Sequence, residues 1–166
     1  PGALLYPGDD DGAAVPPGST DGYLSGVQLP LIGGPDGGAS RTFEVWARGP
    51  ASCDQQLLTT PDFTVDLYDC SSSQEVVVNL KLSGQYGGRF DWGDDQWHLY
   101  DIVYDASAGT LAIYADGVLL GSEAYSLDTP ADPQAATLGG DGGVDVDEFA
   151  VYPTALTATQ VDEVGR

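Results

Sequence analysis

Short apolar runs separated by turn residues are the dominant pattern along this chain. In the segment reading RTFEVWAR (41–48), apolar and polar positions alternate, which predicts a β-strand with one buried face. One side of that strand carries Phe43, Val45 and Ala47, and the other carries Glu44, Trp46 and Arg48. The segment EVVVNLKL (75–82) shows a similar alternation, which places Val76, Val78, Leu80 and Leu82 inward.

The stretch from Trp97 to Gly121 predicts three further strands and two turns. Its second turn is the dipeptide Asp116-Gly117, a strong hairpin signal because both positions must tolerate positive φ. Pairing around this turn predicts Ile113 opposite Leu120 and Tyr114 opposite Leu119. The apolar face of the hairpin would then hold Leu111, Ile113, Ala115, Val118 and Leu120.

One helix is predicted, near the end of the chain. Thr157 and Gln160 have the spacing of a capping box, so the helix should start near Thr157. The 166 residues show no internal repeat or boundary, which predicts one domain over residues 1–166. With 23 Gly and 11 Pro between the apolar runs, the expected fold is an all-β antiparallel sandwich with one short C-terminal helix.

The net charge of −21 changes the list of expected partners. It arises from 26 acidic residues against five basic ones. A field of that sign repels phosphate backbones and anionic lipid surfaces, so we expect no nucleic-acid partner. No apolar run approaches the ~20 residues that span a bilayer, so no membrane insertion is expected. The chain opens on Pro1 without a methionine, which predicts a piece excised from a longer protein.

Several motifs in order resemble the laminin-G-like domains of the concanavalin-A-like jelly-roll superfamily. They read LLYPGDDDGAAVP, TFEVWAR, WHLYDIVYD, LAIYADGVLLG and DEFAVYPTALT. The resemblance implies a jelly roll, a fold that hosts lectins, adhesion modules, hydrolases and structural domains. We therefore expect a non-catalytic carbohydrate-recognition or adhesion module of a larger exported or virion-borne protein. Its partner would be a surface glycan or a protein receptor, and its location extracellular, on a cell surface or on a virion.

Two alternatives to the lectin interpretation stay open. The domain could be structural, mediating contacts between neighbouring subunits of a virion or surface layer. It could also be a glycoside hydrolase, since hydrolases of this superfamily use two carboxylates on one concave strand. Their E-x-D-x-x-E pattern is absent from this chain, so we expect no enzyme. The single histidine, His98, is expected to be structural.

The loop reading SGQYGGRFDWGDDQ is the predicted ligand site. Sugars bind where aromatic faces lie beside convergent polar groups, and this loop combines the two. The residues predicted to bind are Tyr86, Arg89, Trp92 and Asp94. The alternative is that the aromatic side chains of the loop cap the end of the sandwich core.

Calcium is the expected cofactor. Asp147 shares strand parity with Phe149 and Val151, so it should point toward the apolar side, where a carboxylate needs a cation or several N–H donors. The resemblance implies a calcium ion near the pairing of the first and last strands, which would bring Asp9 and Asp11 toward Asp147. Carboxylate oxygens are suitable ligands for Ca²⁺. Alternatively, backbone N–H groups satisfy Asp147, and the acidic turn Asp9-Asp10-Asp11-Gly12 is only solvated.

The two cysteines, Cys53 and Cys70, flank two predicted strands around Pro61-Asp62. A hairpin centred there places them opposite each other, which predicts a disulfide. Such a bridge would contribute roughly 3 kcal/mol and would indicate an oxidising compartment. Two free thiols are the alternative.

Overall fold

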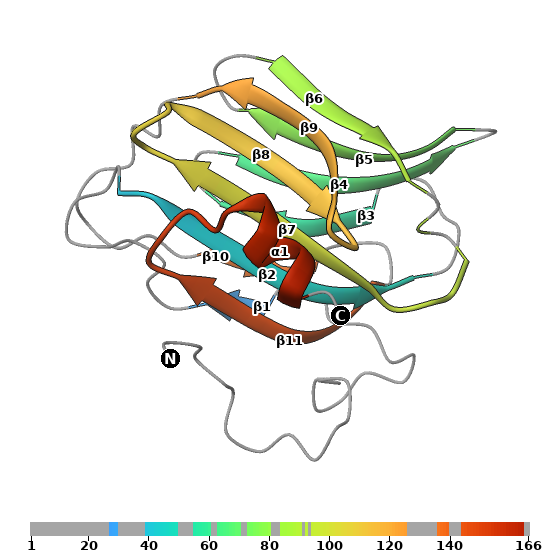
Figure 1. Ribbon diagram of the computed structural model, residues 1–166. Coiled ribbons are helices and arrows are strands. Elements are labelled where there is room, and N and C mark those ends of the chain that lie inside the picture. The colour runs from blue at the N-terminus through green and yellow to red at the C-terminus, as the bar shows by residue number, and fades with distance from the viewer. Residues whose placement is uncertain are drawn as a thin grey trace.

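The computed structural model describes residues 27–29, 39–49, 55–60, 63–70, 73–80, 84–90, 92, 94–125, 136–139 and 144–164. These residues form two antiparallel sheets packed face to face (Figure 1). The six-stranded sheet has the order β1-β10-β3-β4-β5-β6 and the five-stranded sheet the order β11-β2-β7-β8-β9. The predicted antiparallel sandwich is therefore confirmed.

The strands of the six-stranded sheet are β1 (Val27–Leu29), β3 (Gln55–Thr59), β4 (Phe63–Cys70), β5 (Ser73–Leu80), β6 (Gly84–Arg89) and β10 (Ala136–Leu138). Those of the five-stranded sheet are β2 (Arg41–Arg48), β7 (His98–Asp105), β8 (Thr110–Ala115), β9 (Val118–Ala124) and β11 (Asp145–Tyr152). The helix α1 (Ala158–Val164) follows β11 and lies over the outer face of the five-stranded sheet, in front of β2 and β7 (Figure 1).

The core lies between the sheets and follows the alternation of the sequence. Phe43, Val45 and Ala47 of β2 are at most 2% exposed, and Val76 of β5 is fully buried. On β8 every second residue is buried, namely Leu111, Ile113 and Ala115. Burying a large apolar side chain stabilises the fold by about 1.5–3 kcal/mol, so the inward faces of these strands hold the sandwich together.

The β8–β9 hairpin turns at Asp116 and Gly117 as predicted, both with positive φ. Tyr114 pairs with Leu119 as expected, but Ile113 pairs with Gly121 because a bulge shifts the register by one. The prediction that Ile113 faces Leu120 is therefore wrong. Val118 is also not part of a buried face, since it is 59% exposed near the tip of an edge strand.

The two sheets approach closely where β6 passes β9. A Cβ atom added to Gly88 of β6 would lie 2.6 Å from the backbone oxygen of Leu120. Only glycine leaves room for this contact, which brings one edge of the six-stranded sheet against one edge of the five-stranded sheet.

The capping box predicted for the helix is present. The Thr157 hydroxyl accepts a hydrogen bond from the Gln160 backbone N–H at 3.3 Å, and the Gln160 side chain accepts from the Thr157 N–H at 2.9 Å. Just before the helix, the Thr42 hydroxyl donates to the Thr154 carbonyl and accepts from the Leu156 N–H. These bonds fix the start of α1 against β2.

Candidate binding site

The outer face of the five-stranded sheet, over which α1 lies, carries two half-buried tryptophans, Trp46 and Trp97. Trp46 of β2 pairs with Leu99 of β7 on one side and with Asp147 of β11 on the other. Residues that pair directly in an antiparallel sheet share a face, so all three point outward. Trp46 is half-buried, and its ring is therefore partly accessible.

Arg48 connects the second tryptophan to this surface. Its guanidinium carbon lies 5.0 Å from the ring centroid of Trp97, a cation–π distance. Its Nη2 donates to Asp145 Oδ2 at 2.8 Å, and this bond raises the pKa of Arg48 above its usual value. We refer to Trp46, Arg48, Trp97, Asp145 and Asp147 as the tryptophan face.

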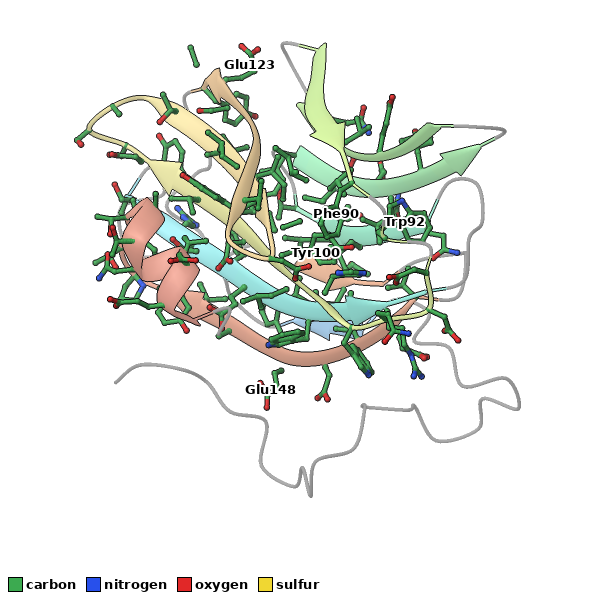
Figure 2. All side chains as sticks on the ribbon, turned by 45° about the vertical axis from the view of Figure 1, so that its right-hand side comes forward. Phe90, Trp92, Tyr100, Glu123 and Glu148 are labelled. Carbon is green, nitrogen blue, oxygen red and sulfur yellow. The ribbon has the colours of Figure 1, made fainter. Side chains whose placement is uncertain are left out.

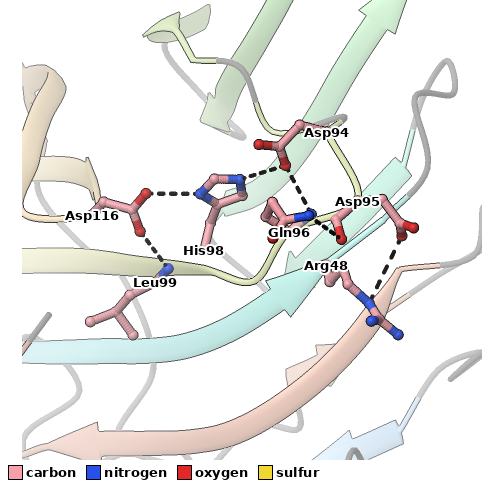
Figure 3. A network of polar contacts seen from close by, with 7 residues as sticks. All are labelled: Arg48, Asp94, Asp95, Gln96, His98, Leu99 and Asp116. Carbon is pink, nitrogen blue, oxygen red and sulfur yellow. Dashed lines mark hydrogen bonds and ion pairs between the residues drawn. The ribbon is translucent and has the colours of Figure 1, made fainter.

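A loop held by His98 reaches the tryptophan face through Asp95, whose Oδ1 lies 4.0 Å from Arg48 Nε (Figure 3). His98 Nε2 lies 3.1 Å from Asp94 Oδ1, and His98 Nδ1 lies 2.8 Å from Asp116 Oδ2. Asp116 also accepts from the Leu99 backbone N–H at 2.9 Å. The backbone N–H of Gln96, and then His98, lower the pKa of Asp94. His98 thus joins this loop to the β8–β9 turn, as expected of a structural histidine.

Of the predicted ligand residues with described side chains, Asp94 belongs to this loop and is exposed, with its carboxylate on His98. Trp92 is 1% exposed and its Nε1 donates to the Tyr68 carbonyl at 3.0 Å. Its ring therefore packs in the core, so the prediction that it stacks on a ligand is wrong. The side chains of Tyr86 and Arg89 lie outside the described part of the structure.

The neighbouring Phe90 supports the capping alternative. Its ring contacts His98 edge-to-face at 4.8 Å and Tyr100 at 6.1 Å between centroids. Figure 2 shows Phe90, Trp92 and Tyr100 together between the sheets. The loop aromatics that are described thus close one end of the core, and the two half-buried tryptophans lie on β2 and immediately before β7.

The prediction that Asp147 points toward the apolar side is wrong. A bulge between Asp147 and Ala150 reverses the parity of β11, and Glu148 there has φ of 44°. Val146 opposite Ala47 points inward and is 4% exposed, while Asp147 points outward opposite Trp46. Asp147 Oδ1 accepts from the Glu148 N–H at 2.9 Å. The sequence could not show this, because the position of a bulge cannot be recognised from the alternation of apolar and polar residues.

The calcium set is only partly described. Asp9 and Asp11 lie outside the described residues, and among the described ones no three Asp, Glu, His or Cys side chains are arranged to hold a metal. Calcium therefore stays a prediction. Cys53 and the side chain of Cys70 also lie outside the described part. In the described pairing of β3 with β4, the residue pair closest to the two cysteines is Gln55 with Leu67, and the register shifts at a bulge between Gln56 and Leu58.

The covered half of the same outer face holds two acids. Glu44 of β2 pairs directly with Asp101 of β7, and they are 7% and 0% exposed. Tyr152 donates to Glu44 Oε1 at 3.2 Å. Burial is the main cause that raises the pKa of both carboxyls; for Asp101, burial and then Glu44 raise it to about 7.

The tryptophan face was missed because the sequence does not show which strand faces remain uncovered. A signal was present, since Trp46 and Arg48 share the outward parity of their strand and Trp97 begins the paired strand. Within the described residues, no helix is long and apolar enough to cross a membrane.

A family model described as the concanavalin A-like lectin/glucanases superfamily matches residues 21–162. No curated protein matches this chain. Among solved structures, the fold is similar to domain 4 of AbnA, an extracellular GH43 arabinanase from Geobacillus stearothermophilus, in complex with arabinotriose. That match has a TM-score of 0.63 and 19% identity, and covers 87% of this chain and 75% of the other.

Two other solved structures have the same fold. The heptameric SAP-like pentraxin from Limulus polyphemus matches with a TM-score of 0.63 and 15% identity, over 90% of this chain and 79% of the pentraxin. The binding domain of botulinum neurotoxin DC, in complex with rat synaptotagmin II, matches with a TM-score of 0.58 and 12% identity. The match covers 76% of this chain but only 35% of the toxin chain, so this chain corresponds to about a third of that binding domain.

Proposed function

Because this chain belongs to the concanavalin A-like lectin/glucanases superfamily, we propose that it is a non-catalytic carbohydrate-recognition module of a larger exported protein. The observation that carries the proposal is the tryptophan face. Two half-buried indole rings, Trp46 and Trp97, lie on one outward surface with a guanidinium fixed between acidic residues. Aromatic rings beside convergent polar groups are the composition of a small-ligand site.

The chemistry of the tryptophan face favours a neutral glycan. Arg48 is its only cation, and Asp145 at 2.8 Å already pairs with it. Asp147 and the nearby Asp95, whose Oδ1 lies 4.0 Å from Arg48 Nε, leave the surface acidic. With a net charge of −21 on the chain, a sulfated or uronic-acid ligand would be repelled. A neutral sugar can stack on the rings and donate hydroxyl hydrogens to the carboxylates.

The similar structures support a binding role. The arabinanase domain was solved with arabinotriose, and toxin binding domains of this fold were solved with SialylT and with rat synaptotagmin II. A lectin role agrees with the first two ligands, and a protein receptor would agree with the third. The similar arabinanase comes from an extracellular enzyme, which supports an exported parent protein for this chain.

The paired acids support a non-catalytic role. A glycosidase needs both carboxylates at the substrate. In the described residues, Glu44 and Asp101 are the acids that face each other across neighbouring strands, and both are buried. A substrate does not reach them there without displacing the helix.

One observation favours a second role, contact with neighbouring subunits of a virion or surface layer. The tip of the β8–β9 hairpin exposes two apolar side chains, Val118 at 59% and Leu119 at 52%. They lie next to each other on an edge strand, where a second chain can approach. A Leu119→Asp variant should then abolish concentration-dependent assembly in sedimentation velocity.

A glycan array followed by calorimetry tests the carbohydrate proposal. We expect neutral oligosaccharides to bind, and Trp97→Ala to weaken binding at least tenfold, equivalent to about 1.4 kcal/mol. Leu119→Ala is the matched control, because it removes an exposed apolar side chain from the same sheet but outside the tryptophan face. Its affinity should equal that of the wild type. If a folded Trp97→Ala variant retains full affinity, the tryptophan face is not the site.

We also propose that calcium stabilises the module through Asp147 together with Asp9 and Asp11. Two features support this: Asp147 adds a carboxylate to an already acidic outer face, and hard oxygen ligands suit Ca²⁺. The described residues alone do not form the site, so the proposal depends on whether the acidic turn reaches Asp147.

A further inference from the structure

The acids Glu44 and Asp101, which the proposed glycan site does not use, lie on the outer face of the five-stranded sheet, the face over which α1 lies. They pair directly across β2 and β7. Side chains in this relation have Cβ atoms about 4.5–5.5 Å apart. Glu44 is 7% exposed and Asp101 is fully buried, so water screens neither charge well.

Three of their four carboxyl oxygens have no hydrogen-bond partner in the described part of the structure. These are Glu44 Oε2 and both oxygens of Asp101. The fourth, Glu44 Oε1, accepts from Tyr152. A buried carboxylate without partners is costly, and the usual outcome is that the group takes up a proton.

The described residues around the pair supply no positive charge. Tyr114 of β8 pairs with Asp101, and the charge of Glu148 on β11 acts on Glu44. On α1, Val161 is fully buried and Asp162 lies against Gly117, while Glu163 is exposed. The ion pairs of the described residues include neither acid. In the described part of the chain, the charged group that acts on the pair from outside is therefore the acid Glu148, and the other titratable neighbours are Tyr114 and Tyr152.

We propose that Glu44 and Asp101 share one proton, carried as an O–H of Asp101 that donates to Glu44 Oε2, and that release of this proton to solvent loosens α1 from the sheet. With the proton bound, the pair carries one negative charge and its facing oxygens are satisfied. Without it, two carboxylates repel each other in a dry space. Water can reach them by displacing α1, whose start is attached to Thr42, two residues from Glu44 on β2.

The sign of the pH dependence follows from the folded state holding the proton more tightly. Burial and then Glu44 raise the pKa of Asp101 from 3.8 to about 7. Between these values the folded chain binds more protons than the unfolded chain, so its stability falls as pH rises. Below about pH 4 and above about pH 7 this contribution no longer changes with pH.

Denaturant unfolding of the wild type and of Asp101→Asn, at constant ionic strength from pH 3.5 to 8.5, tests the proposal. The asparagine amide resembles the protonated acid and can still donate to Glu44. The ratio of the unfolding constant of the wild type to that of the variant should rise by up to about tenfold per pH unit between pH 4 and 7. It should be constant outside that window. A ratio that does not change with pH overturns the proposal.

Asp105→Asn is the matched control, since it changes an acid on the same strand. The pKa of Asp105 is lowered, first by the Ser107 hydroxyl. The ratio of the unfolding constant of the wild type to that of Asp105→Asn should therefore not rise from pH 4 to 7. A second variant, Glu44→Gln, removes the neighbouring charge and should move the upper end of the Asp101 window to lower pH. If Asp105→Asn gives the same curve as Asp101→Asn, general charge repulsion explains the effect and the proposal fails.

Two direct measurements complete the test. Carboxyl ¹³C NMR of the folded wild type should show one group of the pair titrating near neutral pH. Amide exchange of α1 at pH 8, compared with Asp101→Asn at the same pH, should be faster in the wild type. If both carboxyls titrate below pH 5, the pair holds no proton and the proposal fails. If calcium abolishes the difference in exchange between the wild type and Asp101→Asn, and sodium at matched ionic strength does not, the pair holds a metal ion instead of a proton.

Discussion

The outer face of the five-stranded sheet has two halves that are built from the same strands and behave differently. Under α1, strand β2 contributes Glu44, which is 7% exposed and shares its surroundings with Asp101. Beyond the helix, the same strand contributes Trp46 and Arg48, which are partly exposed. In one half the acids are forced toward their neutral forms, and in the other an acid, Asp145, pairs with an arginine at 2.8 Å.

The difference shows that cover, more than residue type, decides what a polar side chain on this sheet can do. Asp101 and Asp145 are the same amino acid on the same sheet face. Removing water raises the cost of the charged form of Asp101, while Asp145 is partly solvated and has a cation beside it. The covered half is thus suited to sensing protons, and the open half is suited to contacting a ligand.

The largest effect is expected from Trp92, the buried counterpart of the two tryptophans in the open half. Trp92→Ala should destabilise the fold by about 3–5 kcal/mol, the usual cost of emptying a buried tryptophan site. Trp97→Ala should cost about 1 kcal/mol or less, because it removes a half-buried ring and one cation–π contact. Thermal and denaturant unfolding measure both. Equal losses would mean that Trp97 is a packing residue and that the open half is not distinct.

Most of the fold could be predicted from the sequence because its strands alternate strictly. The buried faces of β2 and β8, the Asp116-Gly117 turn and the capping box at Thr157 all agree with the structure. Two of the errors lie at bulges. One bulge shifts Ile113 from Leu120 to Gly121, and another turns Asp147 outward. A bulge inserts one extra residue into a strand. A prediction that assumes strict alternation therefore assigns the residues beyond the bulge to the wrong face of the sheet.

The candidate site was less predictable for a different reason. An exposed and a buried tryptophan look alike in a sequence, and the aromatic loop of Trp92 was the more conspicuous segment. What separates Trp92 from Trp97 is tertiary: the first is buried between the sheets, and the second is half-buried beside Arg48. The same holds for Asp101, which is fully buried although it lies on the outward parity of its strand.

Calcium should affect the open half alone, which makes its removal a way to sharpen the comparison. If Asp147 belongs to a calcium site, a hundredfold excess of calcium over its dissociation constant stabilises the fold by about 2.7 kcal/mol. A chelator should then lower the melting temperature, and Asp147→Asn should remove most of that effect. Asp105→Asn should leave the chelator effect intact. If sodium at matched ionic strength restores all that calcium does, charge screening explains the stabilisation and no specific site exists.

The smallest effect concerns the cover itself and compares two valines. Val161 of α1 is fully buried, whereas Val118 at the hairpin tip is 59% exposed. Val161→Ala should cost about 1.6 kcal/mol, because it removes two buried methyl groups at about 0.8 kcal/mol each. Val118→Ala should change stability by no more than about 0.5 kcal/mol. Loosening the helix also admits water to Glu44 and Asp101, so Val161→Ala should lower the pH at which the pair loses its proton, while Val118→Ala should leave it unchanged. Unfolding across pH with carboxyl NMR measures both effects. A Val161→Ala variant that loses stability but keeps the wild-type titration would show that the rest of the sandwich, and not α1, keeps the acids dry.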